Sequence, residues 1–139
     1  MTADELWQES GLVGNHTAWS FGGDTDKLAK LVRAGEKTAT CSALVFYRLE
    51  NEELPQVGEY NIILDSEKNA VCITKTTNVY VTTFDAVSET HAFKEGEGDR
   101  SLEYWRKAHR EFFFEELKTI NQLFDEKMEL ICEEFEVVR

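Results

Sequence analysis

The stretch Gly35-Glu36-Lys37-Thr38-Ala39-Thr40 decides the fold of this 139-residue chain. It follows a segment that begins at Asp24, a good helix N-cap, and carries apolar residues at the three- and four-residue spacing of one buried helix face. Glycine commonly ends a helix because it adopts the left-handed conformation without strain. We therefore expect a helix that stops before Glu36 and delivers Lys37 and Thr40 to a cleft.

Chain length limits the number of domains, and net charge limits the kind of ligand. The chain has 139 residues, of which 42% are apolar, and a net charge of -12. This size fits one domain over residues 1–139, with 1–18 expected as an N-terminal helical extension. The negative charge favours solubility and repels a polyanion, which disfavours binding of duplex DNA. A pocket for one nucleoside, or a short RNA strand, remains allowed.

The cysteines and the hydropathy pattern indicate the compartment. Cys41, Cys72 and Cys132 are odd in number and far apart, which favours free thiols in a reducing cytoplasm. No apolar run approaches the ~20 residues that span a bilayer, and the first residues do not resemble a signal peptide. We expect a cytoplasmic protein without a membrane partner, without a cofactor and without a bound metal.

The local patterns predict a mixture of helices and strands. Helices are expected over 3–12, 24–34, 85–92 and 101–119, and strands over 60–64, 71–84 with a bend at Thr77-Asn78, and 128–138. Residues 41–51 suit either state, with helix favoured, and 15–23 reads as irregular. Asp85 is expected to cap the helix that follows it. This order is typical of an α+β domain, whose short strands could close into a small barrel flanked by helices.

With these elements in place, the motifs resemble a known family. Gly35-x-Lys37-x-x-Thr40 directly after a helix is similar to the GxKxxT signature of ASCH domains, which share the PUA-like β-barrel fold. Further pieces resemble the bacterial branch of that family: Trp19-Ser20-Phe21-Gly22, Leu54-Pro55-Gln56-Val57-Gly58, Glu95-Gly96-Glu97-Gly98-Asp99, and Trp105 with His109. The resemblance implies a PUA-like barrel and a cleft for RNA or a nucleoside-like ligand.

The same resemblance implies candidate catalytic residues. One branch of the family hydrolyses the amide of N4-acetylcytidine with a lysine, a threonine and a downstream glutamate. Carried onto this sequence, these are Lys37, Thr40 and Glu95, with Glu97 close behind. The longer N-terminus and the extra acidic glycine loop are departures from that branch.

The chemistry of such a set can be stated without the family. Burial in a cleft would lower the pKa of Lys37 towards neutrality, so that it could act as a general base on Thr40. The Thr40 oxygen would then attack an amide carbon. A glutamate opposite could orient the lysine or give a proton to the leaving amine. The plain alternative is an exposed lysine and an ordinary strand threonine.

The acidic stretch from Glu95 to Asp99 has three interpretations. It could supply the site glutamate, it could hold a divalent cation through Glu95, Glu97 and Asp99, or it could be a solvated connector. The cation reading is the weakest, because the spacing lacks the full calcium-loop pattern. The sequence contains no Cys-x-x-Cys pair, which excludes a zinc deaminase.

Ligand contacts are expected from aromatic, basic and histidine side chains around this centre. Single-stranded RNA is often read by stacking. Two basic clusters could frame a phosphate-accepting cleft: Lys27, Lys30, Arg33 and Lys37, and Arg100, Arg106, Lys107 and Arg110. Charged residues at helical spacing are more often the water-facing side, and Trp105 also fits a core position. The ligand-binding candidates are Trp19, Phe21, Gly35, Tyr47, Arg100, Trp105, Arg106 and His109, with His91 as a further polar pocket candidate and Phe112 and Phe113 as core.

Two functions follow from the sequence. The first is an amidohydrolase acting on an N4-acylated cytidine-type nucleoside, with Lys37, Thr40 and Glu95 as its working residues. The alternative is a non-catalytic RNA-binding module, and a ribonuclease is a less favoured third reading because the motif specifies no cleavage pair.

Overall fold

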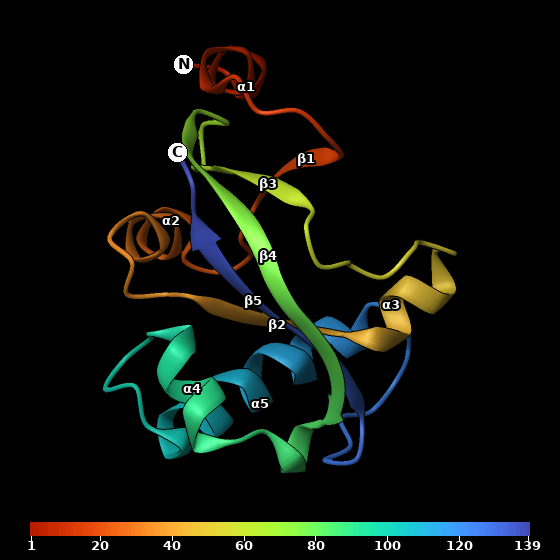
Figure 1. Ribbon diagram of the computed structural model, residues 1–139. Helices are drawn as coiled ribbons and strands as arrows, with labels where there is room; N and C mark the ends of the chain where they lie inside the picture. The colour runs from red at the N-terminus through yellow and green to blue at the C-terminus, as the bar shows by residue number, and fades with distance from the viewer.

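The structure is a computed structural model that describes residues 1–139, and its centre is a five-stranded sheet curled into a half-barrel. Figure 1 shows helices at both ends of this sheet. In chain order the elements are α1 (Ala3–Ser10), β1 (His16–Ser20), α2 (Thr25–Arg33), β2 (Ala39–Ala43), α3 (Leu44–Leu49), β3 (Tyr60–Leu64), β4 (Ala70–Thr83), the 3-10 turn η1 (Phe84–Ala86), α4 (Glu89–Glu95), α5 (Leu102–Lys118) and β5 (Glu129–Val137). The predicted α+β fold with a PUA-like sheet is confirmed.

The curl of the sheet comes from its longest strand, β4. The strand order is β1-β3-β4-β5-β2, with β1 parallel to β3 and all other pairs antiparallel. The first half of β4 pairs with β3 and most of its length with β5, and the register shifts between Thr76 and Asn78. A bulge increases local twist and bends the strand. This is the bend that the sequence placed at Thr77-Asn78.

Three apolar clusters fill the space between the sheet and the helices. α1 packs Leu6 and Trp7 on Ile62 and Ile73, while α2 packs Ala29 and Val32 around Ile63. Because neighbouring strand residues face opposite sides, these two helices cover opposite faces of β3. The third cluster lies between the lower sheet and the helices α3 to α5.

Four local expectations need correction. The segment 15–23 contains β1, a parallel edge strand whose partner β3 lies more than forty residues away in the sequence. Residues 41–51 are divided between β2 and α3. Asp85 lies in η1, and the cap of α4 is Ser88, whose hydroxyl accepts a hydrogen bond from the His91 amide at 3.0 Å. Phe112 is 43% exposed and lies outside the core.

The predicted glycine end of α2 is present. Gly35 has a φ of 77°, and the amides of Glu36 and Lys37 both donate to the Leu31 carbonyl, at 3.0 and 3.1 Å. The helix therefore closes on itself, and Lys37 leads directly into β2. Among the helices, none combines the length and the apolar character that crossing a membrane requires.

Candidate functional site

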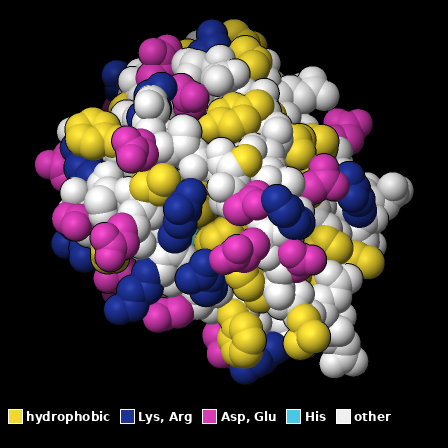
Figure 2. Space-filling view, turned by 90° about the horizontal axis from the view of Figure 1, so that it is seen from below, with side chains coloured by type: hydrophobic (Ala, Val, Ile, Leu, Met, Phe, Trp, Pro, Cys, Tyr) yellow, Lys and Arg dark blue, Asp and Glu magenta, His cyan; other side chains and the backbone are white.

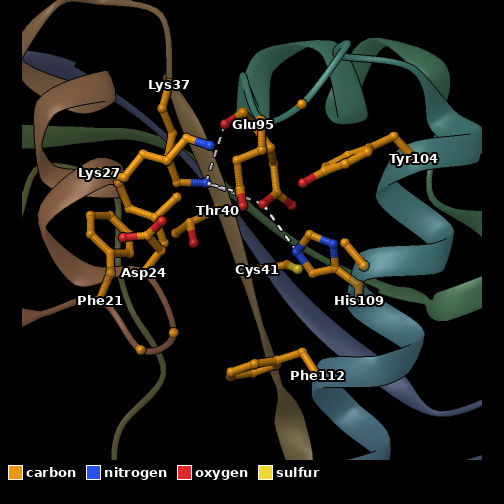
Figure 3. Close-up of a pocket in the computed structure, with 16 residues that line it drawn as sticks. Phe21, Asp24, Lys27, Lys37, Thr40, Cys41, Glu95, Tyr104, His109 and Phe112 are labelled. Carbon is orange, nitrogen blue, oxygen red and sulfur yellow. Dashed lines mark hydrogen bonds and ion pairs between the residues drawn. The ribbon is translucent and has the colours of Figure 1, made fainter.

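The site forms where the start of β2 meets the end of α4. The Thr38 amide donates to the Lys94 carbonyl at 2.7 Å, and the Thr38 carbonyl accepts from the Phe135 amide at 3.0 Å. The segment between α2 and β2 is thereby fixed to both α4 and β5. Figure 3 shows Lys37, Thr40 and Cys41 pointing from this segment towards Glu95 and His109.

Two helical pairs complete the site from the other side. His91 and Glu95 are one turn apart on α4, with His91 Nε2 and Glu95 Oε2 separated by 2.6 Å. Trp105 and His109 are one turn apart on α5 and stack with ring centroids 4.3 Å apart. Residues at i and i+4 share a helix face, so each short sequence spacing brings two polar side chains to the same place.

Lys37 is a buried cation held by two carboxylates. Its side chain is 1% exposed, and Nζ lies 3.3 Å from Glu95 Oε1 and 3.0 Å from Glu97 Oε2. A third contact, at 3.3 Å, is to the Glu95 carbonyl. Burial by itself lowers the pKa of Lys37, but the charges of Glu95 and Glu97 outweigh it and raise the pKa above its ordinary value.

This result corrects the expected chemistry of Lys37. The sequence predicted a lysine of lowered pKa that could deprotonate Thr40, whereas the side chain is an ammonium in the resting protein. Its three N–H donors are matched by the three acceptors named above, and it forms no hydrogen bond to Thr40. Lys37 therefore offers positive charge and not a free base.

Glu95 is the carboxylate around which the cluster is built. It is 1% exposed, and Oε2 accepts hydrogen bonds from His91 and, at 2.7 Å, from the Trp105 indole N–H. Oε1 lies 3.3 Å from Lys37 Nζ and 3.4 Å from His109 Nε2. Burial alone raises the pKa of Glu95, but Lys37 and the two histidines lower it well below its ordinary value. Glu95 is thus an ionised anchor, and it is the last residue of α4, not part of a connector.

Glycines bring Glu97 to the same centre. Gly96 has a φ of 73°, and a Cβ there would lie 2.2 Å from the Glu36 carbonyl oxygen. Gly98 has a φ of 60°, and its Cβ would lie 2.5 Å from the Tyr104 ring. Only glycine permits both the left-handed backbone and these close approaches. The loop after α4 is therefore tightly packed, and it turns Glu97 back towards Lys37.

A cavity of about 280 Å³ opens directly onto this cluster. The Thr40 hydroxyl lies in its lining and forms no hydrogen bond within the protein, so it is available to a ligand. Cys41 lies beside it, but burial raises the pKa of its thiol well above the ordinary value, which keeps it protonated. The polar lining residues are Asp24, Lys27, Lys37, Thr40, Glu95, Glu97, Tyr104 and His109, and the apolar ones include Phe21 and Phe112.

A second cavity, of about 690 Å³, shares a wall with the first. Phe21, Gly22, Thr40, Cys41 and Phe112 line both. Its charged lining residues are all glutamates, and none of the five forms a side-chain hydrogen bond or ion pair with the protein: Glu52, Glu53, Glu59, Glu116 and Glu133. Burial and the neighbouring Glu59 raise the pKa of Glu133 to about 7.

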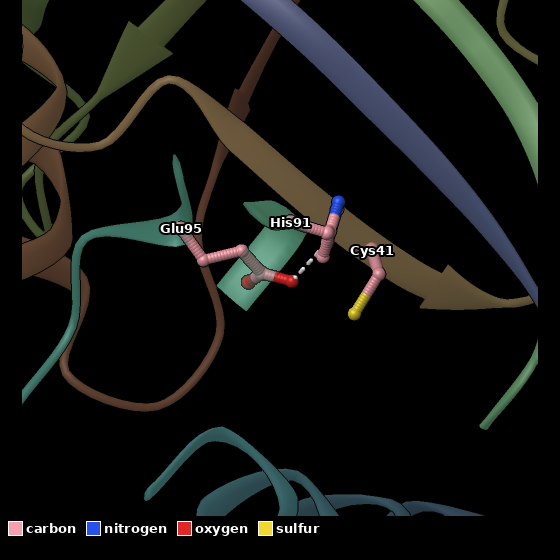
Figure 4. Close-up of side chains that lie close together, drawn as sticks. All are labelled: Cys41, His91 and Glu95. Carbon is pink, nitrogen blue, oxygen red and sulfur yellow. Dashed lines mark hydrogen bonds and ion pairs between the residues drawn. The ribbon is translucent and has the colours of Figure 1, made fainter. Parts of the chain in front are cut away.

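Two groups of side chains have donor atoms close enough for a metal ion. They are Cys41, His91 and Glu95, shown in Figure 4, and Glu95, Glu97 and His109. In both groups the Glu95 carboxylate already accepts hydrogen bonds from neighbouring donors, and no buried side-chain nitrogen or oxygen lacks a partner. A metal would have to displace the Lys37 ammonium and the proton of His91. The donor set thus fits the ion-pair cluster better than a cation site.

The other expected ligand residues divide into three groups. Trp19, Phe21 and Tyr47 line the second cavity, and His109 lines the first. Trp105 and His91 are buried behind Glu95. Gly35, Arg100 and Arg106 line neither cavity: Gly35 ends α2, Arg100 donates to the carbonyls of Phe93 and Glu36, and Arg106 donates to that of Asp85.

The basic clusters do not form a continuous surface. Of the residues that were expected to accept phosphate, only Lys27 and Lys37 line the first cavity, and Arg110 pairs with Glu126 on the surface. On the face seen in Figure 2, basic and acidic side chains are interspersed. Sequence reasoning missed Cys41, Asp24 and Tyr104 as lining residues, because only the folded chain brings them to Lys37.

Known proteins share the fold of this chain. The family model described as "ASCH domain" matches residues 17–139. The structure of an ASCH domain from Lactobacillus crispatus JV V101 is 35% identical and superposes with a TM-score of 0.89, covering 96% of this chain and 91% of that one. Protein EF3133 from Enterococcus faecalis V583 is 38% identical with a TM-score of 0.86, covering 97% and 86%.

A more distant structure shares the fold alone. A variant of ZmASCH from Zymomonas mobilis is 11% identical with a TM-score of 0.53, covering 89% of this chain and 71% of that one. No curated protein matches the chain. The family model covers most of the sequence, including every residue of the charged cluster. This chain therefore belongs to the ASCH-domain family.

Proposed function

We propose that this ASCH domain hydrolyses an amide bond on a nucleoside-sized ligand bound at the charged cluster. One observation carries the proposal: the buried Lys37 ammonium, held between Glu95 and Glu97, lines the same cavity as the unpaired Thr40 hydroxyl. Fully buried charges are costly, and perturbed titratable groups in a cavity are typical of catalytic sites.

The raised pKa of Lys37 supports a role as a stabiliser of negative charge. A preorganised cation in a site shielded from water stabilises the oxyanion that develops when a carbonyl is attacked. In this scheme Thr40 supplies the attacking oxygen, and Glu97, which is 24% exposed and lines the cavity, accepts the Thr40 proton. Glu95 holds the lysine in place.

The second cavity supports a small ligand without phosphate. Together with the first it falls in the size range of ordinary ligand sites, and Trp19 and Tyr47 offer aromatic surface to a base. Its five glutamates face no basic lining residue, so a phosphodiester would meet repulsion there. An acylated nucleoside of the N4-acetylcytidine type meets these requirements better than an RNA strand does.

The test is release of cytidine from N4-acetylcytidine. We expect turnover by the wild type and loss of nearly all of it in Lys37→Met and in Thr40→Val, which removes only the hydroxyl. Lys107→Met is the matched control, because Lys107 is exposed and lies outside both cavities. No release by the wild type, or a Lys37→Met variant as fast as wild type, would refute the proposal. Salt-sensitive binding of short RNA without turnover would instead favour the RNA-binding alternative.

A further inference from the structure

His109 occupies a position that the proposed reaction leaves unassigned. Its side chain is 14% exposed, lines the first cavity and stacks on Trp105. Nδ1 lies 2.9 Å from the Trp105 carbonyl oxygen. A carbonyl can only accept, so Nδ1 carries a proton in every charge state of the ring. The proton that can be exchanged is therefore the one on Nε2.

Nε2 faces the ionised centre. It lies 3.4 Å from Glu95 Oε1, the same oxygen that contacts Lys37. Figure 3 shows the ring beside Cys41 and opposite Thr40 at the edge of the cavity. The ring is therefore fixed in orientation by its stack and its Nδ1 bond, while Nε2 is presented at the place where a bound amide would react.

The surroundings of the ring favour its charged form. Burial by itself lowers the pKa of His109, but Glu95, the Trp105 carbonyl and Glu97 outweigh it and raise the pKa above its ordinary value. The charged and titratable groups that face the ring or the same cavity are Glu95, Glu97, Lys37, Cys41, Asp24, Lys27 and Tyr104. An imidazolium next to a carboxylate at neutral pH can give up a proton when a stronger base is formed beside it.

From this geometry we infer that His109 is the general acid that protonates the leaving amine when the amide bond breaks. The inference rests on the proposed function. An amide nitrogen is a very poor leaving group unless it gains a proton, and Lys37 is committed to Glu95 and Glu97. His109 combines an exchangeable proton with a ring whose orientation is fixed by the Trp105 stack and the Nδ1 bond.

The steps balance in protons and bonds. The Thr40 oxygen bonds to the carbonyl carbon while Glu97 takes the Thr40 proton. The C–N bond then breaks, and His109 Nε2 gives its proton to the departing nitrogen, which leaves as the free amine. Water next attacks the Thr40 ester and passes a proton to neutral His109. Thr40 leaves and regains its proton from Glu97, so carboxylic acid and amine are the products and the enzyme is restored.

The inference is tested with two acetyl donors that differ in their need for a proton. N4-acetylcytidine must release an amine, whereas 4-nitrophenyl acetate releases a phenolate that leaves unprotonated. For His109→Gln, whose amide can still donate a hydrogen bond to Glu95, we expect amide turnover to fall ~10²–10⁴-fold. The initial burst of 4-nitrophenolate, which reports acylation of Thr40 alone, should change little. His91→Gln is the matched control: His91 positions Glu95 from behind, so both reactions should fall together.

The pH dependence and a direct titration provide a second readout. The acid must be protonated, so wild-type amide turnover should fall as pH rises through the raised pKa of His109, and this alkaline limb should be absent in His109→Gln. Nitrogen NMR of the wild type should show Nδ1 always protonated and Nε2 titrating above 6.5, the ordinary value.

The outcomes separate the two claims. Equal losses of amide turnover and of the 4-nitrophenolate burst in His109→Gln, unchanged amide turnover, or an Nε2 that is unprotonated at neutral pH would each overturn the role of His109 while leaving the hydrolase intact. A wild type that releases no cytidine would overturn the proposed function and the general acid with it.

Discussion

The two cavities share a wall, but the buried charged side chains that line the first are paired and those that line the second are not. In the first, the Lys37 ammonium and the histidines surround Glu95 so closely that its pKa lies well below its ordinary value. In the second, five glutamates face open space without a basic partner, and the pKa of Glu133 rises to about 7. Compensated charge holds groups in fixed positions for chemistry, whereas uncompensated charge selects the charge of a ligand.

The largest effect should come from breaking the compensated cluster. Lys37→Met leaves the buried Glu95 and Glu97 without their cation, and removal of one partner from a buried pair typically costs about 3–5 kcal/mol. Urea unfolding at pH 7 measures the loss, with the exposed Lys107→Met as control. A loss no greater than that of the control would contradict the compensation described for this cavity.

Acid sensitivity should identify the same cluster. Because the folded pKa of Glu95 is depressed, its stabilisation is complete above the unfolded value near 4.5 and is lost as pH falls through the folded pKa. Lys37→Met removes the largest lowering charge, so the acid limb of its unfolding curve should begin at higher pH than that of the wild type. Identical acid limbs would show that Lys37 does not set the pKa of Glu95.

The close packing of the loop that carries Glu97 can be tested by comparing substitutions at two glycines of equal φ. Gly96 and Gly11 both have a φ of 73°, but a Cβ at Gly11 meets nothing within 4 Å, whereas one at Gly96 reaches the Glu36 carbonyl. Gly11→Ala should cost about 1 kcal/mol. Gly96→Ala should cost about 3 kcal/mol and also reduce turnover, because Glu97 moves away from Lys37. Similar losses in both variants would mean that the close approach is unimportant.

In the second cavity, the contribution of Glu133 to the free energy of unfolding should change with pH in the direction opposite to that of Glu95. The folded pKa of Glu133 is raised, so this carboxyl destabilises the fold progressively as pH rises from about 4.5 to about 7. Glu133→Gln should therefore gain on the order of 2 kcal/mol at pH 8 and almost nothing at pH 4. Glu134→Gln, next in sequence, loses its pairing with Lys94 and should be slightly destabilised instead. A pH-independent effect at Glu133 would contradict its assigned burial.

The smallest expected effect is the difference in affinity between a neutral and a negatively charged ligand. Cytidine should bind more tightly than cytidine 5′-monophosphate by about tenfold at low salt, and added salt should narrow the gap. Calorimetric titration measures both, and Glu133→Gln should reduce the difference. Preference for the monophosphate would assign the glutamates a role other than selection of charge.

Local signals in the sequence accounted for much of the fold. The glycine end of α2, the strands β3 to β5 and the bend of β4 all depend on short-range patterns. β1 was missed because its pairing with β3 is a tertiary contact that no neighbouring residue indicates. The helix end at Glu95 was missed because the alternating glycines read as a flexible loop, although Gly96 is an αL helix cap packed against Glu36.

The sequence predicted which residues line the candidate site but not their charge states. Lys37, Thr40, Glu95 and Glu97 line one cavity, as the motif suggested. The predicted direction of the Lys37 pKa shift was wrong. Burial lowers the pKa, but the two carboxylates that raise it come from nearly sixty residues away in the sequence. The pairing of His91 with Glu95 and of Trp105 with His109 follows from i, i+4 spacing and could have been found in the sequence.

The most direct test of the catalytic cluster is to look for its covalent intermediate. The protein is mixed with N4-acetylcytidine, quenched in acid at short times, and analysed by mass spectrometry of its peptides. We expect an acetyl group on Thr40 in the wild type, and neither adduct nor cytidine release in Thr40→Val. Cytidine release by Thr40→Val at the wild-type rate would contradict the role of Thr40 as the nucleophile of the cluster.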